Sequence, residues 1–337
     1  MLELKLGMDI GNKNLKVSTE VGQSHEIAVA YKEISEWDYF NESIGQDMEK
    51  IKYHNKYYFI GLQCENGLPA NKGDIKYREI ANMFKLAGLA RELRRHDAVS
   101  GEFYIVTGTP LLDYNAFKYD YIDLMLSETN NNEIIEMNGK EYNIKVKDTL
   151  VTKQSACIAP TIPSWKEKEF VIVDFGGGTL DIAYFIKGAK KQYDTIDFSL
   201  NQVLTDLGNI LNDYKLGIPR PNILDSGFIK IMEDIIYTGQ YKYVSTITIE
   251  GNQYDIKKFV DTYLQAQIDK IMEEIKIKLK ISNTDAKYID VFFIGGGAKL
   301  SNNQILQNKT FANKKIIENP QFANVEAYAK IAKSKRW

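Results

Sequence analysis

Residues 171–185 read Val171-Ile-Val-Asp-Phe-Gly-Gly-Gly-Thr-Leu-Asp-Ile-Ala-Tyr-Phe185, and residues 6–17 carry an imperfect copy of that stretch, Leu-Gly-Met-Asp-Ile-Gly-Asn-Lys-Asn-Leu-Lys-Val. Asp9 aligns with Asp174, at an offset of 165 residues that holds along the whole copy. Each copy predicts an apolar strand, a tight glycine-containing turn and a second strand of alternating character. The two halves of the chain therefore open with the same local structure.

The two turns indicate a phosphate site. Gly11 and Gly176 occupy equivalent positions, where glycine permits φ > 0 and lets backbone N–H groups approach an anion closely. Two such turns facing each other would hold a polyphosphate from both sides, and Asp9 and Asp174 would hold a hydrated Mg²⁺, which prefers oxygen ligands. A single Asp-x-Gly after a strand is often only a β-turn, but the repetition favours the phosphate interpretation. Neither copy has the spacing of a Walker A loop or of a dinucleotide-binding fingerprint.

Length and charge narrow the class of protein. A chain of 337 residues predicts two domains, each large enough for its own core. Its hydrophobic and charged fractions, 44% and 26%, are those of an ordinary globular protein. The formal net charge of −2 argues against nucleic-acid binding as the dominant activity of the surface.

Cysteines, histidines and apolar runs exclude other classes. Cys64 and Cys157 form no metal-binding spacing and no disulfide framework, which predicts a cytoplasmic protein. The three histidines suggest no catalytic triad. The N-terminus does not resemble a signal peptide, and no run approaches the roughly 18 apolar residues that cross a bilayer. We therefore expect no membrane partner.

The pattern of elements repeats in the two halves. In each half, three strands precede alternating helices and strands. The first half is expected to have strands at 4–10, 15–19, 26–30, 57–60 and 103–107, helices at 78–95 and 117–128, a hairpin within 133–146, and a short helix that finishes before Pro160. The second half is expected to have strands at 170–174, 179–186, 193–198, 291–294 and 315–317, a hairpin within 243–256, and helices at 226–237, 259–280 and 325–333.

This repetition predicts an α/β fold of two similar domains around a nucleotide cleft, each a mixed sheet with flanking helices and a smaller inserted subdomain. The first domain is expected to span residues 1–163, with an insertion at about 31–99. The second is expected to span 164–319, with an insertion at about 199–257. The C-terminal helix, within 320–337, is expected to pack back onto the first domain.

Five segments in fixed order resemble the motifs of the actin/heat-shock-chaperone/sugar-kinase ATPase superfamily. They are the two phosphate motifs at 6–17 and 171–184, the connecting segments at 150–156 and 319–328, and an adenosine motif, Phe-Phe-Ile-Gly-Gly-Gly-Ala-Lys-Leu, at 292–300. The phrase Asn-Pro-Gln-Phe-Ala-Asn at 319–324 and the phrase Val-Thr-Gly-Thr-Pro-Leu-Leu at 106–112 are most similar to the ParM/StbA group of plasmid-segregating bacterial actins.

The resemblance implies roles for individual residues. Asp9 and Asp174 would anchor Mg²⁺ through its waters, and Asp181 would orient the attacking water or the metal hydration shell. Gln154 would position that water near the γ-phosphate; a neutral amide is a poor general base, so hydrolysis would be slow. The phosphate-contacting residues would be Gly11, Asn12, Asn14 and Lys16 in the first motif and Gly176, Gly177, Gly178 and Thr179 in the second. The residues next to the base and ribose would be Gly295, Gly296, Gly297 and Gly208.

The resemblance implies a nucleotide-dependent filament that segregates plasmids, with slow ATP or GTP hydrolysis coupled to disassembly of the polymer. Its partners would be further copies of itself, head to tail, and a small DNA-binding adaptor protein on a plasmid site, without direct nucleic-acid binding. A small-metabolite kinase of the same superfamily is one alternative, although no motif for a substrate-binding base is found. A cell-shape or division actin is another, although neither end of the chain carries a convincing apolar membrane-binding face.

Overall fold

The computed structural model describes residues 1–11, 14–20, 22–45, 47–61, 64, 66, 75–126, 132–177, 179–196, 198, 206, 246–249 and 252–337. Its internal contacts divide the chain into two units. Unit 1 is Met1–Cys157 together with Asn324–Trp337, and unit 2 is Ile158–Ala323. The predicted boundaries at 163/164 and 319/320, and the two predicted insertions, stay predictions.

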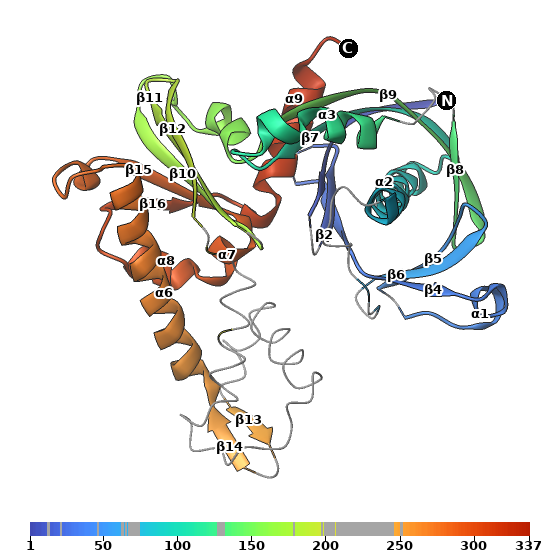
Figure 1. Cartoon of the computed structure of the whole chain (residues 1–337), viewed down its shortest axis with the longest axis horizontal. Coiled ribbons are helices and arrows are strands. Elements are labelled where there is room, and N and C mark those ends of the chain that lie inside the picture. Colours follow the sequence, from blue (N-terminus) through green and yellow to red (C-terminus); the bar gives the residue numbers. More distant parts are fainter. Residues whose placement is uncertain are drawn as a thin grey trace. The chain divides into compact units, whose positions relative to one another are not determined.

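Unit 1 is built on a nine-stranded mixed sheet that curves around helix α2 (Ile75–Arg95) (Figure 1). The strand order across the sheet is β3-β2-β1-β7-β9-β8-β5-β6-β4. The strands are β1 (Leu2–Ile10), β2 (Asn14–Ser18), β3 (Ser24–Ala28), β4 (Tyr31–Ile34), β5 (Met48–Tyr53), β6 (Lys56–Gly61), β7 (Ser100–Thr109), β8 (Glu133–Met137) and β9 (Lys140–Lys153). The other helices of this unit are α1 (Glu36–Asn41), α3 (Tyr114–Met125) and α9 (Ala323–Ser334), with the start of a 3₁₀ helix, η1 (Ala156–Thr161).

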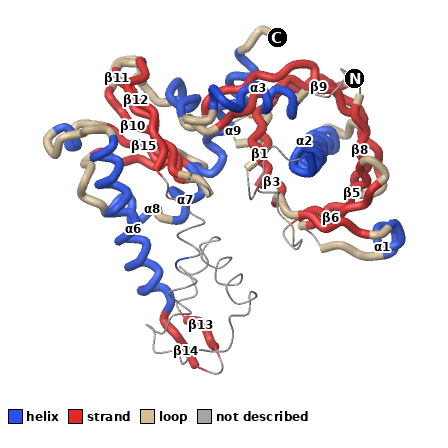
Figure 2. Tube along the Cα trace, in the orientation of Figure 1, coloured by secondary structure: helices blue, strands red, loops and turns tan. Residues whose placement is uncertain are grey.

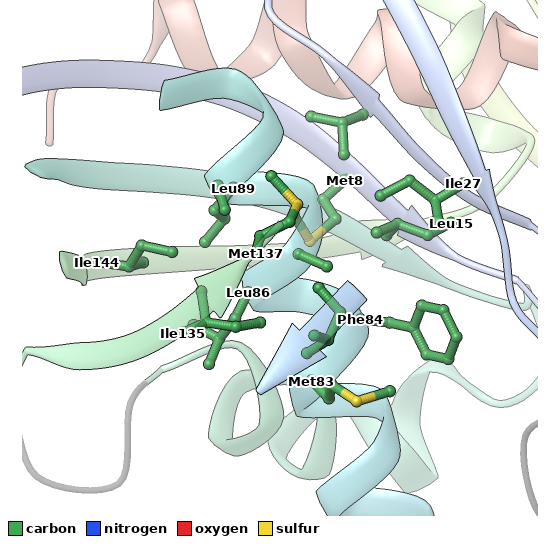
Figure 3. Close-up of a cluster of buried hydrophobic side chains, with 14 of the residues drawn as sticks. Met8, Leu15, Ile27, Met83, Phe84, Leu86, Leu89, Ile135, Met137 and Ile144 are labelled. Carbon is green, nitrogen blue, oxygen red and sulfur yellow. The ribbon is translucent and has the colours of Figure 1, made fainter. Parts of the chain in front are cut away.

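Helix α2 fills the inside of the curved sheet with apolar side chains. Figure 3 shows Met83, Phe84, Leu86 and Leu89 of α2 among side chains from β1, β2, β3, β8 and β9. All four are fully buried. Burial of one such side chain contributes about 1.5–3 kcal/mol, so this helix is the main apolar support of the sheet that carries the first turn.

Unit 2 is built on a five-stranded sheet of order β12-β11-β10-β15-β16. The strands are β10 (Glu169–Phe175), β11 (Leu180–Ile186), β12 (Ala189–Ile196), β15 (Asp290–Ile294) and β16 (Asn313–Ile316), with a separate hairpin of β13 (Thr246–Ile249) and β14 (Asn252–Asp255). The remaining elements are α6 (Ile256–Lys278), α7 (Gly295–Leu300), α8 (Asn302–Gln307) and the 3₁₀ helices η3 (Asp285–Lys287) and η4 (Pro320–Phe322). The long helix α6 lies along the sheet and buries Leu264, Ile268 and Ile271 in the same core as Val171 and Ile182 (Figure 2).

The two sheets share one topology, which confirms the predicted fold class. The order β3-β2-β1-β7-β9 in unit 1 matches β12-β11-β10-β15-β16 in unit 2. In both, the first two pairings are antiparallel and the next two are parallel. The repeated sequence stretches form the equivalent hairpins β1–β2 and β10–β11.

Several local predictions were wrong. The short helix after Gln154 does not finish before Pro160 but contains it, as part of η1; a fixed φ near −65° suits a helical turn when the missing N–H is not needed. The segment 31–53 holds β4, α1 and β5, none of which was predicted. The predicted helix at 226–237 lies outside the described residues.

Candidate functional site

The first half-site is the turn between β1 and β2. The Gly11 N–H donates to the Asn14 carbonyl oxygen at 3.1 Å and closes the turn. Asp9, near the end of β1, lies directly opposite Lys16 on β2. The Asn14 side-chain amide donates to Glu26 Oε2 on β3 at 3.1 Å. The sequence-predicted residues Asp9, Gly11, Asn14 and Lys16 are thus neighbours on one hairpin.

The second half-site repeats this geometry between β10 and β11. The Gly176 N–H donates to the Thr179 carbonyl oxygen at 3.0 Å, the counterpart of the first turn. Asp174 lies directly opposite Asp181. The Thr195 hydroxyl on β12 donates to Asp181 Oδ1 at 2.6 Å and orients that carboxylate. Both acids are buried, and Thr179 is exposed at the turn.

These two turns require glycine because a side chain would not fit, and not because the backbone is left-handed. Neither Gly11 nor Gly176 has a positive φ, so that part of the sequence interpretation was wrong. A Cβ at Gly11 would lie 3.1 Å from the Asn14 carbonyl oxygen, and one at Gly176 would lie 2.9 Å from the Thr179 oxygen. A larger residue would push apart the two atoms that close each turn.

The two half-sites differ in charge at one equivalent position. Lys16 and Asp181 are 165 residues apart, the same offset that relates Asp9 to Asp174. Unit 1 therefore pairs a carboxylate with an ammonium across its hairpin, whereas unit 2 opposes two carboxylates. Like charges directly opposite each other destabilise an antiparallel pair. The Asp174–Asp181 pair would be relieved by a cation, and oxygen-rich surroundings suit Mg²⁺.

Burial raises the pKa of Asp9 above its ordinary value, and the positive charge of Lys16 lowers it in part. The charged form of Asp9 is therefore costly in the folded protein. A bound cation would offset that cost, because it adds positive charge to that of Lys16.

Gln154 directly follows β9, and its side chain lies beside Asp9 of β1. Its backbone N–H donates to the Thr109 carbonyl oxygen at 2.8 Å, at the ends of β9 and β7. Its side-chain Nε2 donates to Asp9 Oδ1 at 3.4 Å. Tyr121 of α3 is a further neighbour: burial raises its pKa to about 12, with a contribution from the charge of Asp9. Nothing in the sequence pattern pointed to Tyr121.

Asn324 holds the turn that follows Gln154, a role that the sequence did not reveal. Ser155 is buried and has a φ of +59°, which is uncommon for a residue other than glycine, asparagine or aspartate. Its N–H donates to Asn324 Oδ1 at 2.9 Å, and the Cys157 thiol donates to the same oxygen at 3.7 Å. Asn324 stands in the second connecting segment, so the two connecting segments meet at this turn.

Helix α9, which carries Asn324, fits against glycines of β1 and β7. A Cβ at Gly7 would lie 2.2 Å from the Val325 carbonyl oxygen. A Cβ at Gly108 would lie 2.0 Å from the Tyr328 hydroxyl oxygen and 3.1 Å from Gln154 Cγ. These glycines allow α9 to approach the sheet closely, directly behind Gln154.

The glycine run after β15 has a packing role of its own. Gly295 has a φ of +89°, and a Cβ there would lie 2.4 Å from the Phe175 carbonyl oxygen and 2.7 Å from Asp174 Oδ1. A Cβ at Gly297 would lie 2.2 Å from the Phe175 ring. Gly296 is half-buried between them. Gly295 therefore lies beside Asp174, while the predicted contact of this run with a nucleoside stays a prediction.

Three predicted residues, Asn12, Gly178 and Gly208, lie outside the described residues. In the part of the chain that the structure describes, no cluster of three or more His, Cys, Asp or Glu side chains could hold a metal ion. None of the described helices is both long and apolar enough to cross a membrane.

Two family models match the chain in succession. Residues 7–156 match the actin-like proteins N-terminal domain, and residues 169–325 match the Alp7A C-terminal domain. No curated protein matches the chain in sequence.

Solved structures of actin-like proteins share the fold over nearly the full length. The crystal structure of actin-like protein Alp7A is 18% identical, with a TM-score of 0.73, and 99% of this chain and 97% of that chain are covered. Ta0583, an archaeal actin homologue in complex with ADP, is 13% identical, with a TM-score of 0.71 and 99% and 100% covered. The Alp12 filament structure is 15% identical, with a TM-score of 0.65 and 99% of each chain covered. With its repeated hairpins, its duplicated sheet topology and these two successive domain matches, the chain belongs to the actin-like proteins.

Proposed function

We propose that this chain is a nucleotide-dependent filament protein that segregates plasmids, and that it hydrolyses ATP or GTP slowly. The observation that carries the proposal is the pair of matched half-sites, each a strand-end carboxylate beside a glycine turn closed by the same hydrogen bond. The ADP complex of the archaeal homologue and the filament of Alp12 support nucleotide binding and self-assembly as the activities to test first.

In this proposal each turn contributes donors to the phosphates of the nucleotide. The backbone of the two turns, with Lys16 and the exposed Thr179, supplies N–H, ammonium and hydroxyl donors. Asp9 and Asp174 would hold Mg²⁺ through water. The donor set fits this ion, because each half-site presents a carboxylate at the end of a strand, and carboxylate oxygens are ligands that Mg²⁺ prefers. The bound ion would neutralise charge on the phosphate oxygens.

Gln154 is proposed to orient the attacking water. Its amide lies within 3.4 Å of Asp9 and its backbone is fixed at both ends of the turn. An amide can accept one hydrogen bond from a water and donate another, but it takes up a proton poorly. Hydrolysis would therefore rely on positioning and charge neutralisation, and it would be slow.

The filament would use a heterologous head-to-tail contact, which generates an open polymer unless its rotation closes a ring. A triphosphate would favour the assembling conformation, and loss of its γ-phosphate would weaken the lattice. The near-neutral charge of the chain supports a cytoplasmic filament that reaches plasmid DNA through a small DNA-binding adaptor protein.

Sedimentation tests the proposal. Purified protein is centrifuged over a concentration series with Mg²⁺-ATP, with Mg²⁺-GTP and without nucleotide, and phosphate release is measured in parallel. Polymer is expected above a critical concentration with at least one nucleotide, and not in its absence. A protein that stays monomeric with both nucleotides while it phosphorylates a small metabolite would be a kinase instead.

A further inference from the structure

Helix α1 presents two large aromatic side chains to solvent. Trp37 is 68% exposed and Phe40 is 64% exposed, although the helix has only six residues. Exposed aromatic residues that lie together often mark a surface for a partner. We name Trp37, Phe40 and the acidic residues of 32–42 the aromatic tip.

The aromatic tip is held rigidly. A capping box between Ser35 and Asp38 fixes the start of α1. Tyr39, on the inner side of the helix, is buried, and its hydroxyl donates to Glu136 at 2.7 Å. Lys50 on β5 donates to the Tyr39 carbonyl oxygen at 2.6 Å. Because the helix is fixed before any partner arrives, little ordering entropy is lost on binding, which favours a strong contact.

The aromatic tip is acidic. Residues 32–42 contain four acidic residues and one lysine. Lys50 on β5 already contacts the Tyr39 carbonyl oxygen. A partner that suits this surface would combine positive charge with exposed aromatic or aliphatic groups.

Unit 2 offers such a surface at one end of its sheet. The β11–β12 turn at Gly188 lies against Trp165 and Lys166, since a Cβ there would be 3.4 Å and 3.3 Å from their side chains. The Lys187 N–H donates to the Lys168 carbonyl oxygen at 2.8 Å. Tyr288, two residues before β15, is 76% exposed. We name this surface the lysine edge; its members are Lys166, Lys168, Lys187, Lys190, Lys191, Lys287, Trp165 and Tyr288.

Of the six lysines of the lysine edge, two form ion pairs with carboxylates of the described residues. Lys168 lies 3.7 Å from Asp290 and Lys191 lies 4.0 Å from Glu169. Among the described residues, no carboxylate lies within 4.0 Å of the ammonium groups of the other four lysines. Lys190 instead lies over the Tyr193 ring, at 4.6 Å. The edge is therefore complementary in charge to the aromatic tip.

We propose that the aromatic tip of one copy docks on the lysine edge of the next copy. The proposal rests on the proposed filament and names the two surfaces of one contact between its subunits. Trp37 and Phe40 would be the buried anchors, and the lysines would surround them and pair with the acids of 32–42. The two surfaces differ, so the contact is heterologous and leaves a free tip and a free edge to continue the polymer.

The first test removes the anchors. The double variant Trp37→Ala, Phe40→Ala is expected to raise the critical concentration about 30-fold or more, the effect of losing a buried aromatic anchor. Nucleotide binding by the monomer should be unchanged, which shows that the variant is folded. The matched control is Tyr119→Ala on α3, where Tyr119 is 70% exposed, and it should assemble like wild type. Normal assembly of the double variant overturns the proposal.

The second test asks which surface the tip meets. Cysteines are placed at Asn41→Cys in the tip and Lys190→Cys in the edge, and polymer is treated with a short bismaleimide; the native Cys64 and Cys157 are buried. A chain with both substitutions should give a covalent ladder, and a mixture of the two single variants should give dimers and nothing larger. The pair Asn41→Cys, Lys118→Cys is the control and should give neither.

The outcomes separate the two proposals. If wild type forms no polymer with either nucleotide, the filament fails and this contact fails with it. If wild type assembles but the Asn41–Lys190 pair gives no ladder, this contact alone is wrong. If charge reversal by Lys187→Glu and Lys190→Glu leaves assembly normal while it abolishes binding to an oligonucleotide, the edge serves nucleic acid and the contact is again wrong.

Discussion

Asp174 and Asp181 lie opposite each other across a hairpin, at the positions where the first half-site has Asp9 and Lys16. Asp174→Ala should lower Mg²⁺-dependent nucleotide hydrolysis to below about 1% of wild type, because an anchoring carboxylate of the metal shell is lost. Phosphate release at saturating nucleotide and Mg²⁺ measures the effect. Turnover at the wild-type rate would remove Asp174 from the metal site.

Asp9 allows a test of stability that needs no nucleotide. Burial raises its folded-state pKa, so the charged carboxylate costs stability at pH values above that pKa, and the cost disappears below the ordinary value of 3.8. Asp9→Asn removes the charge. The midpoint of thermal unfolding should therefore rise at pH 7 without Mg²⁺, by about 2–4 °C for each kcal/mol removed. The gain should shrink as the pH falls towards 3.8.

The control for this experiment is Asp123→Asn on α3, where the carboxylate is exposed. This variant should unfold at the wild-type temperature both at pH 7 and as the pH falls towards 3.8. A loss of stability in Asp9→Asn at pH 7 would mean that Lys16 and Gln154 stabilise the carboxylate more than burial destabilises it.

At the scale of elements, α9 supports the turn that carries Gln154. Asn324→Ala removes the acceptor of the Ser155 N–H, which holds a residue of positive φ. Hydrolysis should slow about 10-fold or more, while KM changes less than about 2-fold, because the phosphate donors lie on other elements. Asn324→Asp keeps a side-chain oxygen at the same place and should restore most of the rate.

A purely structural role of Asn324 predicts a different pattern. Both Asn324 variants would then lose thermal stability in parallel with activity, and KM would rise together with the fall in kcat. Circular dichroism during heating and a full kinetic titration of both variants distinguish the two cases.

Elements with strong periodicity could be predicted from the sequence, and the others could not. Helix α2 has apolar residues at helical spacing and was expected within a few residues of its ends. The Asn138-Gly139 turn of the β8–β9 hairpin was also expected, but β9 continues to Lys153, beyond the predicted end at residue 146. The segment 31–53 mixes charged and aromatic residues without a clear period, since α1 exposes Trp37 and Phe40 but buries Tyr39, and since β4 pairs with β6 and β5 with β8. Long-range pairing of this kind leaves little local signal.

The same division applies to the candidate site. The residues on the two hairpins were predicted because the repetition at a fixed offset marks them. Tyr121 and the role of Asn324 were missed, because each acts through a contact with a residue that is distant in the chain. Spacing along one sequence carries no information about such contacts.

At the scale of the whole molecule, hydrolysis and assembly should separate when Gln154 is changed. Gln154→Ala should slow hydrolysis about 10- to 1000-fold, the effect of one lost preorganised hydrogen-bonding group. Nucleotide affinity should stay nearly unchanged. Filaments of the variant should form and persist longer than wild type after a limited dose of nucleotide, as followed by light scattering.

Two results would contradict this expectation. Filaments that disassemble at the normal rate although hydrolysis is slow would break the link between γ-phosphate loss and lattice weakening. Normal hydrolysis would make Gln154 a structural residue, and Asp181, held by the Thr195 hydroxyl, would be the next group to test.

The fit of α9 against Gly7 and Gly108 sets an order of events during synthesis. Residues 324–334 follow all of unit 2 in the chain, yet they complete unit 1. Until α9 has been synthesised, the face of the unit 1 sheet beside β1 and β7 is therefore uncovered. Unit 2 is contiguous in the chain and can fold before unit 1 is complete. Nascent chains stalled before residue 323 should expose unit 1 to pulse proteolysis, and chains released beyond 334 should not. Resistance of unit 1 in the shorter chains would show that it folds without its final helix.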